Sequence, residues 1–220
     1  MNPPITDMAA LGRQLRCPEG ALAQEVADYI FASNEYMIRQ TIDRLFLTSG
    51  ERILEVGFGN GGHLPYLFAQ GDNLHYTGIE RSEEMLLRAR EQYMPLIEQG
   101  KAVFLKATEG AMPKLPEEAF EVFFLVNTYY FIQDLRGYFE RLYPMLTRGG
   151  RLALGYIDKD FGEHMPFTQE VFTFYTNEQI GQWLLEVGFS SFGITSYTEE
   201  IFSKNGRTVT RPFHIAIAIK

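Results

Sequence analysis

Residues 52–62 read RILEVGFGNGG, a short apolar run that leads into a glycine-rich loop. An apolar run stopped by glycine is typical of a buried parallel strand. Glycines between a strand and a helix let the backbone approach a ligand closely, and the free amides of a helix N-terminus favour an anion. Gly57, Gly59 and Gly62 fit the G-x-G-x-x-G pattern of dinucleotide sites, and Glu55 stands two residues before the first of them. The stretch therefore predicts the ligand-binding turn of an α/β sheet.

Outward from this turn, short apolar runs alternate with amphipathic helical patterns. The predicted strands cover residues 52–57, 75–79, 102–105, 120–126, 151–157, 191–197 and 212–219. This alternation predicts a doubly wound, Rossmann-like α/β fold. Asn205-Gly206 is a type I′ turn signal between the last two strands, and strands joined by a tight turn pair antiparallel. We therefore expect a seven-stranded, mostly parallel sheet with a C-terminal antiparallel hairpin.

The helices carry their own sequence signals. Ser82 and Asp134 are predicted N-caps, and Thr176 with Gln179 predicts a capping box. A helix is also expected to start near Gly61 or Gly62. The first 50 residues follow a helical pattern throughout. We expect one domain over residues 1–220, in which the helical segment 1–50 forms a lid on a Rossmann-like core of residues 51–220.

Composition excludes several classes of function. Lys and Arg number 20 against 28 Asp and Glu, and this net charge of −8 argues against a general nucleic-acid binder. The single cysteine, Cys17, excludes a disulfide framework and a thiolate zinc site within one chain, and no spacing of His, Asp and Glu indicates a metal. No run approaches the roughly 18 apolar residues of a membrane helix, and the N-terminus lacks a signal-peptide pattern. We expect a cytoplasmic protein without a metal or a membrane partner; its oligomeric state stays open.

Two carboxylates accompany the glycine loop. Glu55 needs a cationic partner, which the ammonium group of a methionine moiety would supply and the phosphates of a dinucleotide would not. Glu80 ends the second predicted strand, 18 residues after Gly62. A carboxylate at that position can accept both hydroxyl groups of a ribose. Together the two sites suit a ligand with an amino acid at one end and a nucleoside at the other.

With these residues the chain resembles the class I S-adenosylmethionine-dependent methyltransferases, particularly the small-molecule enzymes that include those of quinone biosynthesis. The resemblance runs from about Glu51 to the C-terminus. Its segments are LEVGFGNGGHLPYL, YTGIERSEEMLLRAR, AFEVFFLVNTYYFIQD, TRGGRLALGY and TNEQIGQWLLEVGF. The resemblance implies S-adenosylmethionine as cofactor and the parallel sheet with its final hairpin.

The resemblance also implies roles for single residues. Those that would bind the methionine portion of the cofactor are Glu55, Gly57, Gly59 and Gly61, with Glu55 near the amino group. Those that would bind the nucleoside are Glu80 at the ribose, Arg81 beside it and Met85 against the adenine. The family commonly has an Asp after the third strand, whereas this chain has KATEG at residues 106–110. Thr108 or Glu109 would take that place.

The acceptor side is expected beyond the central strand. Asn127, Tyr129 and Tyr130 follow this strand, where the family's site faces both the sulfonium group and the acceptor. Asn127 and Tyr130 also stand at the spacing of the N-P-P-Y motif of amino-group methyltransferases, without its prolines. The remaining lid would come from Tyr29, Asn34 and Tyr36 and from the aromatic-rich segment 158–175. If a base is needed, His164 is the first candidate and Tyr130 the second.

The expected reaction is an in-line displacement that carries a methyl group to a small apolar or aromatic acceptor. Alignment of the reacting atoms and exclusion of water are then the main contributions of the protein. A nicotinamide-dependent oxidoreductase is the competing enzyme, because it would use the same glycines. About 50 residues before the first strand, and little room for a separate substrate domain, weigh against it. A non-catalytic protein that binds S-adenosylmethionine is the third possibility.

Overall fold

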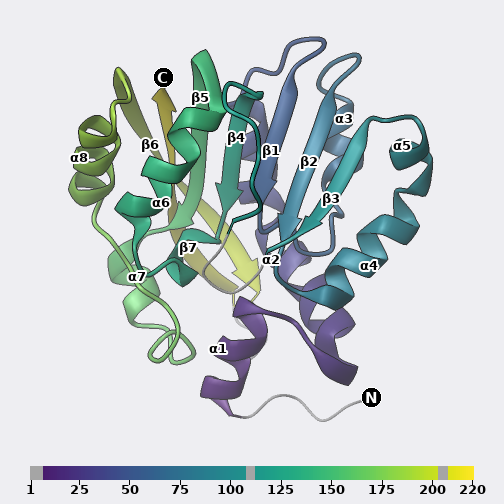
Figure 1. Ribbon diagram of the computed structural model, residues 1–220. Helices are drawn as coiled ribbons and strands as arrows, with labels where there is room; N and C mark the ends of the chain where they lie inside the picture. Colours follow the sequence, from purple (N-terminus) through teal and green to yellow (C-terminus); the bar gives the residue numbers. More distant parts are fainter. Residues whose placement is uncertain (1–6, 108–111, 203–207) are drawn as a thin grey trace.

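A single sheet lies between two layers of helices (Figure 1). The computed structural model describes residues 7–107, 112–202 and 208–220. The sheet has seven strands in the order β3-β2-β1-β4-β5-β7-β6. Its strands are β1 (Arg52–Val56), β2 (His75–Glu80), β3 (Ala102–Lys106), β4 (Phe120–Val126), β5 (Leu146–Ile157), β6 (Ser191–Phe202) and β7 (Thr208–Ile219).

The pairing of the strands confirms the predicted fold class. Strands β3, β2, β1, β4 and β5 are parallel, whereas β7 pairs antiparallel with both β5 and β6. The last strand, β7, therefore lies between β5 and β6, and β6 forms the edge of the sheet. The predicted turn at Asn205-Gly206 lies outside the described residues.

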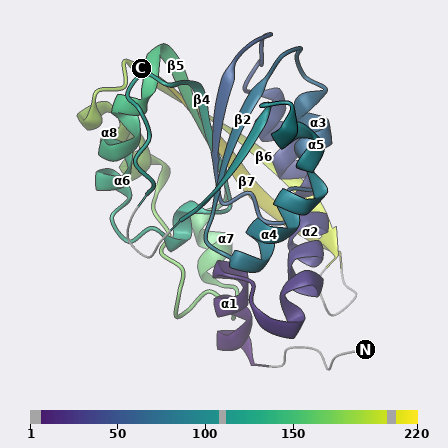
Figure 2. The same ribbon diagram turned by 45° about the vertical axis from the view of Figure 1, so that its right-hand side comes forward.

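Helices cover both faces of the sheet, as the turned view in Figure 2 shows. One layer consists of α2 (Ala23–Asp43), α3 (Leu64–Phe68), α4 (Glu83–Gln92) and α5 (Met94–Glu98), and the other of α6 (Leu135–Leu142) and α8 (Asn177–Val187). Two clusters of buried apolar side chains fill the layers, centred on Leu64 and Leu86 on one face and on Phe139 and Leu184 on the other. The other two α-helices of the described residues, α1 (Met8–Arg16) and α7 (Lys159–Glu163), lie beyond the carboxyl ends of the central strands (Figure 1).

The predicted helix caps are confirmed. Ser82 accepts the Met85 amide, Asp134 accepts the Gly137 amide, and Thr176 forms the capping box with Gln179. The helix of the glycine loop begins later than predicted, at Leu64. Gly61 has a φ of +68°, which is incompatible with a right-handed helix, so the loop must end before α3 can start.

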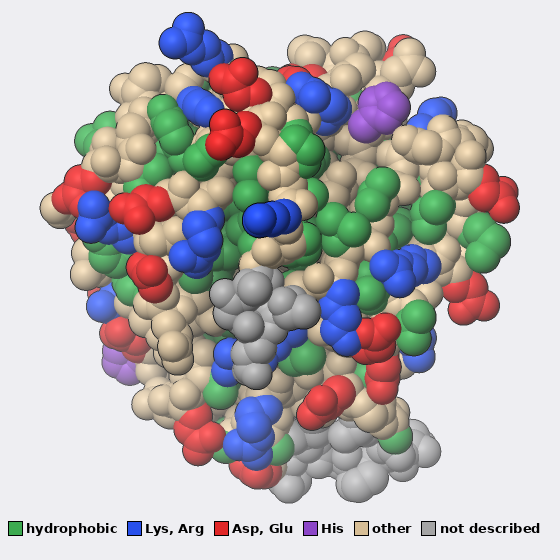
Figure 3. Space-filling model, viewed as in Figure 1, with side chains coloured by type: hydrophobic (Ala, Val, Ile, Leu, Met, Phe, Trp, Pro, Cys, Tyr) green, Lys and Arg blue, Asp and Glu red, His purple; other side chains and the backbone are tan. Residues whose placement is uncertain are grey.

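Charge is distributed in a mixed pattern on the face shown in Figure 3. Hydrophobic side chains gather across the middle of this face, and acidic and basic side chains are interspersed around them. No single-sign basic patch forms on this view of the described residues. In those same residues, no helix is long and apolar enough to cross a membrane.

Candidate cofactor and acceptor site

The glycine loop connects the end of β1 to α3 and turns sharply at three positions. Gly57, Gly59 and Gly61 have φ angles of +81°, +59° and +68°, which only glycine adopts without cost. The Gly57 amide donates to the Ile79 carbonyl at 2.8 Å, so the loop leaves β1 while still bonded to β2. This conformation explains why the sequence requires glycine at alternating positions.

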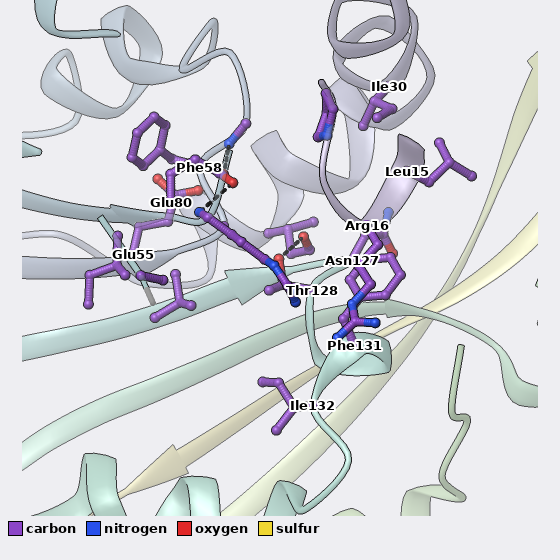
Figure 4. Close-up of a pocket in the computed structure, with 18 of the residues that line it drawn as sticks. Leu15, Arg16, Ile30, Glu55, Phe58, Glu80, Asn127, Thr128, Phe131 and Ile132 are labelled. Carbon is purple, nitrogen blue, oxygen red and sulfur yellow. Dashed lines mark hydrogen bonds between the residues drawn. The ribbon is translucent and has the colours of Figure 1, made fainter. Parts of the chain in front are cut away.

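Glu80 holds the glycine loop from the neighbouring strand. Its Oε2 accepts the Gly59 amide at 2.9 Å, and its Oε1 accepts the Arg81 and Ser82 amides at 2.7 and 2.9 Å. The residue is 6% exposed. Burial raises the pKa of this carboxyl group above its usual value, although the three amide hydrogen bonds oppose the shift. Glu80 is thus both part of the cavity wall and the link between β2 and the loop (Figure 4).

Glu55 lies in a buried polar network beneath the same loop. Its Oε2 contacts His63 Nε2 at 2.7 Å and accepts the Tyr76 hydroxyl at 2.6 Å. Glu55 and His63 are 3% and 4% exposed, and both line the cavity. This Glu55 oxygen, for which a cationic group of a ligand was expected, therefore already has two hydrogen-bond partners within the protein, the His63 imidazole and the Tyr76 hydroxyl. From the sequence alone, His63 was expected only to cap a helix or to pack, since its pairing with Glu55 depends on the turn of the loop.

The tight contact at Gly57 gives a prediction. An alanine Cβ there would lie 2.4 Å from Thr128 Oγ1, whereas at Gly59 it would have no atom within 4 Å. We expect Gly57→Ala to lower the free energy of unfolding by about 2–4 kcal/mol, from the left-handed backbone and the overlap together. Gly59→Ala should cost only about 1 kcal/mol, from the backbone alone. Urea unfolding would measure the free energy of unfolding of both variants. An equal decrease in the two would contradict the steric overlap with Thr128. In a Gly57→Ala protein, the second substitution Thr128→Ala should restore part of the lost stability.

A cavity of about 750 Å³ opens over the glycine loop at the carboxyl ends of β1, β2 and β4. Its floor includes Glu55–Asn60, Glu80 and Arg81, and the end of β4 contributes 126–128. Helices α1 and α2 cover it, with Arg16 from the former and Asn34 from the latter. Predicted residues that line this cavity are Glu55, Gly57, Gly59, Glu80, Arg81 and Asn127. We call it the cofactor cavity.

A second cavity of about 380 Å³ adjoins the first. The two share Leu15, Ile30, Asn34, Asn127 and Phe131. The second cavity is lined mainly by apolar and aromatic side chains, among them Leu11, Phe161, Phe167 and Phe172. Its lining includes one charged side chain among the described residues, Arg211, and no Asp, Glu or His. We call it the apolar cavity.

Asn127 stands at the junction of the two cavities in a left-handed conformation, with a φ of +52°. Tyr130 accepts the Ile157 amide at 2.5 Å and donates its hydroxyl to Asn127 Oδ1 at 2.9 Å. Burial raises the pKa of Tyr130 far above its usual value. Tyr130 lines the apolar cavity as a neutral hydroxyl that fixes the orientation of Asn127.

The structure does not bring every predicted residue to these cavities. Met85 is fully buried and packs with Ala23 and Ala27, and Tyr129 is buried among tyrosine rings. Tyr36 is 48% exposed, and its ring contacts that of Phe213. His164 is exposed at the end of α7, where its Nδ1 contacts the Asp160 carbonyl. None of these four lines either cavity.

Three predicted residues remain: Gly61, Thr108 and Glu109. Gly61 forms part of the turn but does not line the cavity, because the direction in which a Cβ would point is occupied by Tyr93 and Leu64. Thr108 and Glu109 lie outside the described residues. No group of three or more His, Cys, Asp and Glu suited to a metal occurs in the part of the chain that the structure describes.

Comparison with known proteins identifies similar sequences. A family model described as a methyltransferase domain matches residues 54–154. The chain is 32% identical over 130 residues to the uncharacterized methyltransferase YdaC of Bacillus subtilis, covering 59% of this chain and 69% of that protein. It is 28% identical over 138 residues to O-methyltransferase rstn1 of Aspergillus nomiae, covering 63% of this chain and 60% of that protein.

Longer relatives match over a smaller share of their length. Phosphoethanolamine N-methyltransferase 1 of Zea mays is 24% identical over 185 residues, which cover 80% of this chain and 35% of that protein. Among solved structures, Haemonchus contortus phosphoethanolamine N-methyltransferase 2, in complex with phosphomonomethylethanolamine and S-adenosylhomocysteine, has a TM-score of 0.71 at 16% identity. The match covers 99% of this chain and 61% of that one. A SAM-dependent methyltransferase from Aquifex aeolicus has a TM-score of 0.63 at 21% identity, covering 88% and 97%.

Proposed function

The chain belongs to the S-adenosylmethionine-dependent methyltransferases, and we propose that it transfers a methyl group to a small apolar or aromatic acceptor bound in the apolar cavity. The observation that carries the proposal is the pair of adjoining cavities, one lined by the glycine loop and Glu80, the other by aromatic side chains. They meet at Asn127, where a methyl group would pass from one to the other. The flat, apolar rings of quinols and phenols suit the second cavity.

The residues of the first cavity fit the cofactor. S-adenosylmethionine supplies a methyl group activated by a positively charged sulfur. The left-handed glycines keep Cβ atoms away from the ligand, and Glu80 faces the cavity as an acceptor for ribose hydroxyl groups. Glu55 and His63 form a buried polar floor beside the loop. We propose that residues 1–50 act as a lid, because α1 and α2 line both cavities.

The contribution of the protein to the reaction is alignment and exclusion of water. The apolar cavity has no Asp, Glu or His among its described lining residues, so it offers no ordinary general base. Tyr130 stays protonated at neutral pH because burial raises its pKa. The acceptor atom must therefore be nucleophilic without proton removal by these groups. Carbon acceptors of the enol type and acidic hydroxyl groups meet this requirement.

The charged side chain in the lining of the apolar cavity, Arg211, also limits which kind of acceptor the cavity suits. Arg211 donates from Nε and Nη2 to Glu199 Oε1 at 2.9 and 2.7 Å, so its charge is already neutralised. A phosphate group needs several cationic or amide donors that are not otherwise bonded. The cavity thus suits an apolar acceptor better than phosphoethanolamine, although relatives with that name match the chain.

The pH dependence of cofactor binding should follow Glu80. Burial raises the pKa of the carboxyl group in the unliganded protein, and ribose hydroxyl groups that donate to it favour its ionised form. The bound state therefore holds this proton less tightly, so affinity should fall as the pH is lowered through the raised pKa. Calorimetric titration at a series of pH values, from above neutrality down to the lowest pH at which the protein stays folded, would show the fall together with proton release on binding. An affinity that stays constant over this range would contradict the ribose assignment.

Two experiments test the proposal. Titration with S-adenosylmethionine, S-adenosylhomocysteine and NADH should show binding of the first two only; binding of NADH alone would favour an oxidoreductase. Release of S-adenosylhomocysteine would then be measured with a panel of quinols, naphthols, naphthylamines and phosphoethanolamine. Turnover with the aromatic acceptors supports the apolar cavity as the acceptor site, whereas turnover with phosphoethanolamine alone would overturn it. Cofactor binding without any turnover would favour a non-catalytic binder.

A further inference from the structure

The outer part of the C-terminal hairpin extends beyond the end of β5. Strand β5 pairs with β7 only as far as Ile157↔Phe213, whereas β6 and β7 stay paired for several residues past this point. The outer end of the hairpin lies beside α2 in both views of the fold (Figure 1, Figure 2). Three of its side chains, those of Ile201, Val209 and Arg211, line the apolar cavity, and none of the three lines the cofactor cavity. The hairpin therefore walls the part of the apolar cavity that the cofactor cavity does not share.

Arg211 is the charged residue of this wall, and one edge of its guanidinium group is occupied. Nε and Nη2 both donate to Glu199 Oε1, directly across the hairpin, and Nη2 also donates to the Ser33 carbonyl. The remaining nitrogen, Nη1, forms no hydrogen bond with a described residue. It retains accessible surface, because it is not among the unpaired side-chain nitrogens that the fold seals from solvent. Since Arg211 is only 5% exposed and lines the apolar cavity, Nη1 faces the cavity interior.

A guanidinium group held in this way favours one kind of ligand atom. The N–H groups of Nη1 need an acceptor, and an oxygen atom is the usual one. Glu199 already balances the charge of Arg211, so a carboxylate or phosphate group would leave a net negative charge in a buried site, which is costly. A neutral carbonyl or hydroxyl oxygen would satisfy the donor without this cost.

We propose that Arg211 determines which acceptors bind, because its Nη1 donates to a neutral carbonyl or hydroxyl oxygen of a flat aromatic molecule in the apolar cavity. This inference rests on the proposed function, since it names the chemical class of the acceptor. The methylated atom then lies near Asn127, where the two cavities meet, and the oxygen lies at the hairpin. Arg211 binds and orients the acceptor and takes no part in proton transfer, since a guanidinium group stays protonated.

Three probes that share one ring system test the proposal. They are 1-indanone, which has a neutral carbonyl group, indane, which has no oxygen, and indane-1-carboxylate, which is an anion. Ligand-observed NMR titration in saturating S-adenosylhomocysteine gives each dissociation constant. The wild type should bind 1-indanone more tightly than the carboxylate, and the reverse order would overturn the neutral class. The comparison measures binding alone, so it stays decisive even if no acceptor is methylated and the proposed function fails.

The double substitution Glu199→Leu with Arg211→Met removes the donor without leaving a buried charge. It should weaken binding of 1-indanone by about 10-fold or more, as expected for a hydrogen bond from a charged donor, and change the affinity for indane by less than about twofold. Arg44→Met is the matched control, because Arg44 donates to Tyr197 of the same hairpin at 2.8 Å but lines neither cavity. This control should change none of the three affinities. Unweakened binding of 1-indanone, or an equal weakening of indane in a folded double variant, would overturn the proposal.

A single substitution gives a second test that keeps the guanidinium group in place. Glu199→Gln retains an oxygen for Arg211 but removes the negative charge, so the guanidinium is no longer balanced. The affinity for indane-1-carboxylate should then rise by about 10-fold relative to that for 1-indanone. An unchanged ratio of the two affinities would show that Arg211 does not contact the acceptor.

Discussion

Glu80→Ala is expected to abolish measurable binding of S-adenosylmethionine. The substitution removes the acceptor that we propose for the ribose and at the same time leaves three backbone amides, those of Gly59, Arg81 and Ser82, without their partner. A hydrogen bond to a charged group contributes about 1.5–3 kcal/mol, so loss of the two bonds proposed for the ribose hydroxyl groups should by itself lower the affinity by more than about 100-fold. Calorimetric titration with S-adenosylmethionine measures it directly.

The control for Glu80 lies three residues further along the chain. Glu83 is exposed at the start of α4 and pairs with Lys106, so Glu83→Ala should leave the affinity unchanged. Glu80→Gln keeps the size of the side chain but brings an NH₂ group toward backbone N–H donors, and it should lose affinity as well. Unchanged affinity in Glu80→Ala would contradict both the ribose contact and the support of the glycine loop.

Glu199→Ala is expected to destabilise the protein strongly, because it removes the ion-pair partner of Arg211, the charged side chain in the lining of the apolar cavity. Glu199 and Arg211 are 9% and 5% exposed and form a buried ion pair, and Arg211 also donates to the Ser33 carbonyl of α2 at 2.7 Å. Burial raises the pKa of Glu199, and the guanidinium opposes the shift. Removal of one partner leaves a buried charge uncompensated, which costs about 3–5 kcal/mol. Urea unfolding would show this as a lower midpoint.

A double substitution distinguishes the uncompensated charge from simple loss of packing. Glu199→Leu with Arg211→Met replaces the pair by apolar groups and should be less destabilised than Glu199→Ala. A double variant that is at least as unstable as the single one would show that the hydrogen bond from Arg211 to α2, rather than the charge, dominates.

The parts of the fold that the sequence predicted are those with local signals. The strand that ends before Gly57 and the helix capped by Thr176 could be predicted, because an apolar run and a capping box are each formed by a few neighbouring residues. Glu80 was predicted at the cavity because it ends a strand next to the glycine loop, and parallel strands end at one edge of the sheet.

The residues that the sequence could not place depend on packing between distant segments. Arg16 reaches the cavity only because α1 packs on the chain around Phe167, more than a hundred residues later. Tyr36 and Met85 sit on correctly predicted helices, but the side of the helix that meets the cavity is set by neighbouring elements. The pairing of His63 with Glu55 likewise arises from the left-handed turns of the loop, which bring residues of a strand and a loop together.

The aromatic wall of the apolar cavity has an optical consequence. The sequence contains a single tryptophan, Trp183, whose ring lies 5.0 Å from that of Tyr175, edge to face. Tyr175 belongs to the segment that carries Phe167 and Phe172, and its hydroxyl donates to the carbonyls of Ile132 and Gln133. The emission of one indole therefore reports on the segment that lines the apolar cavity, so the unmodified protein contains its own fluorescent probe of that wall.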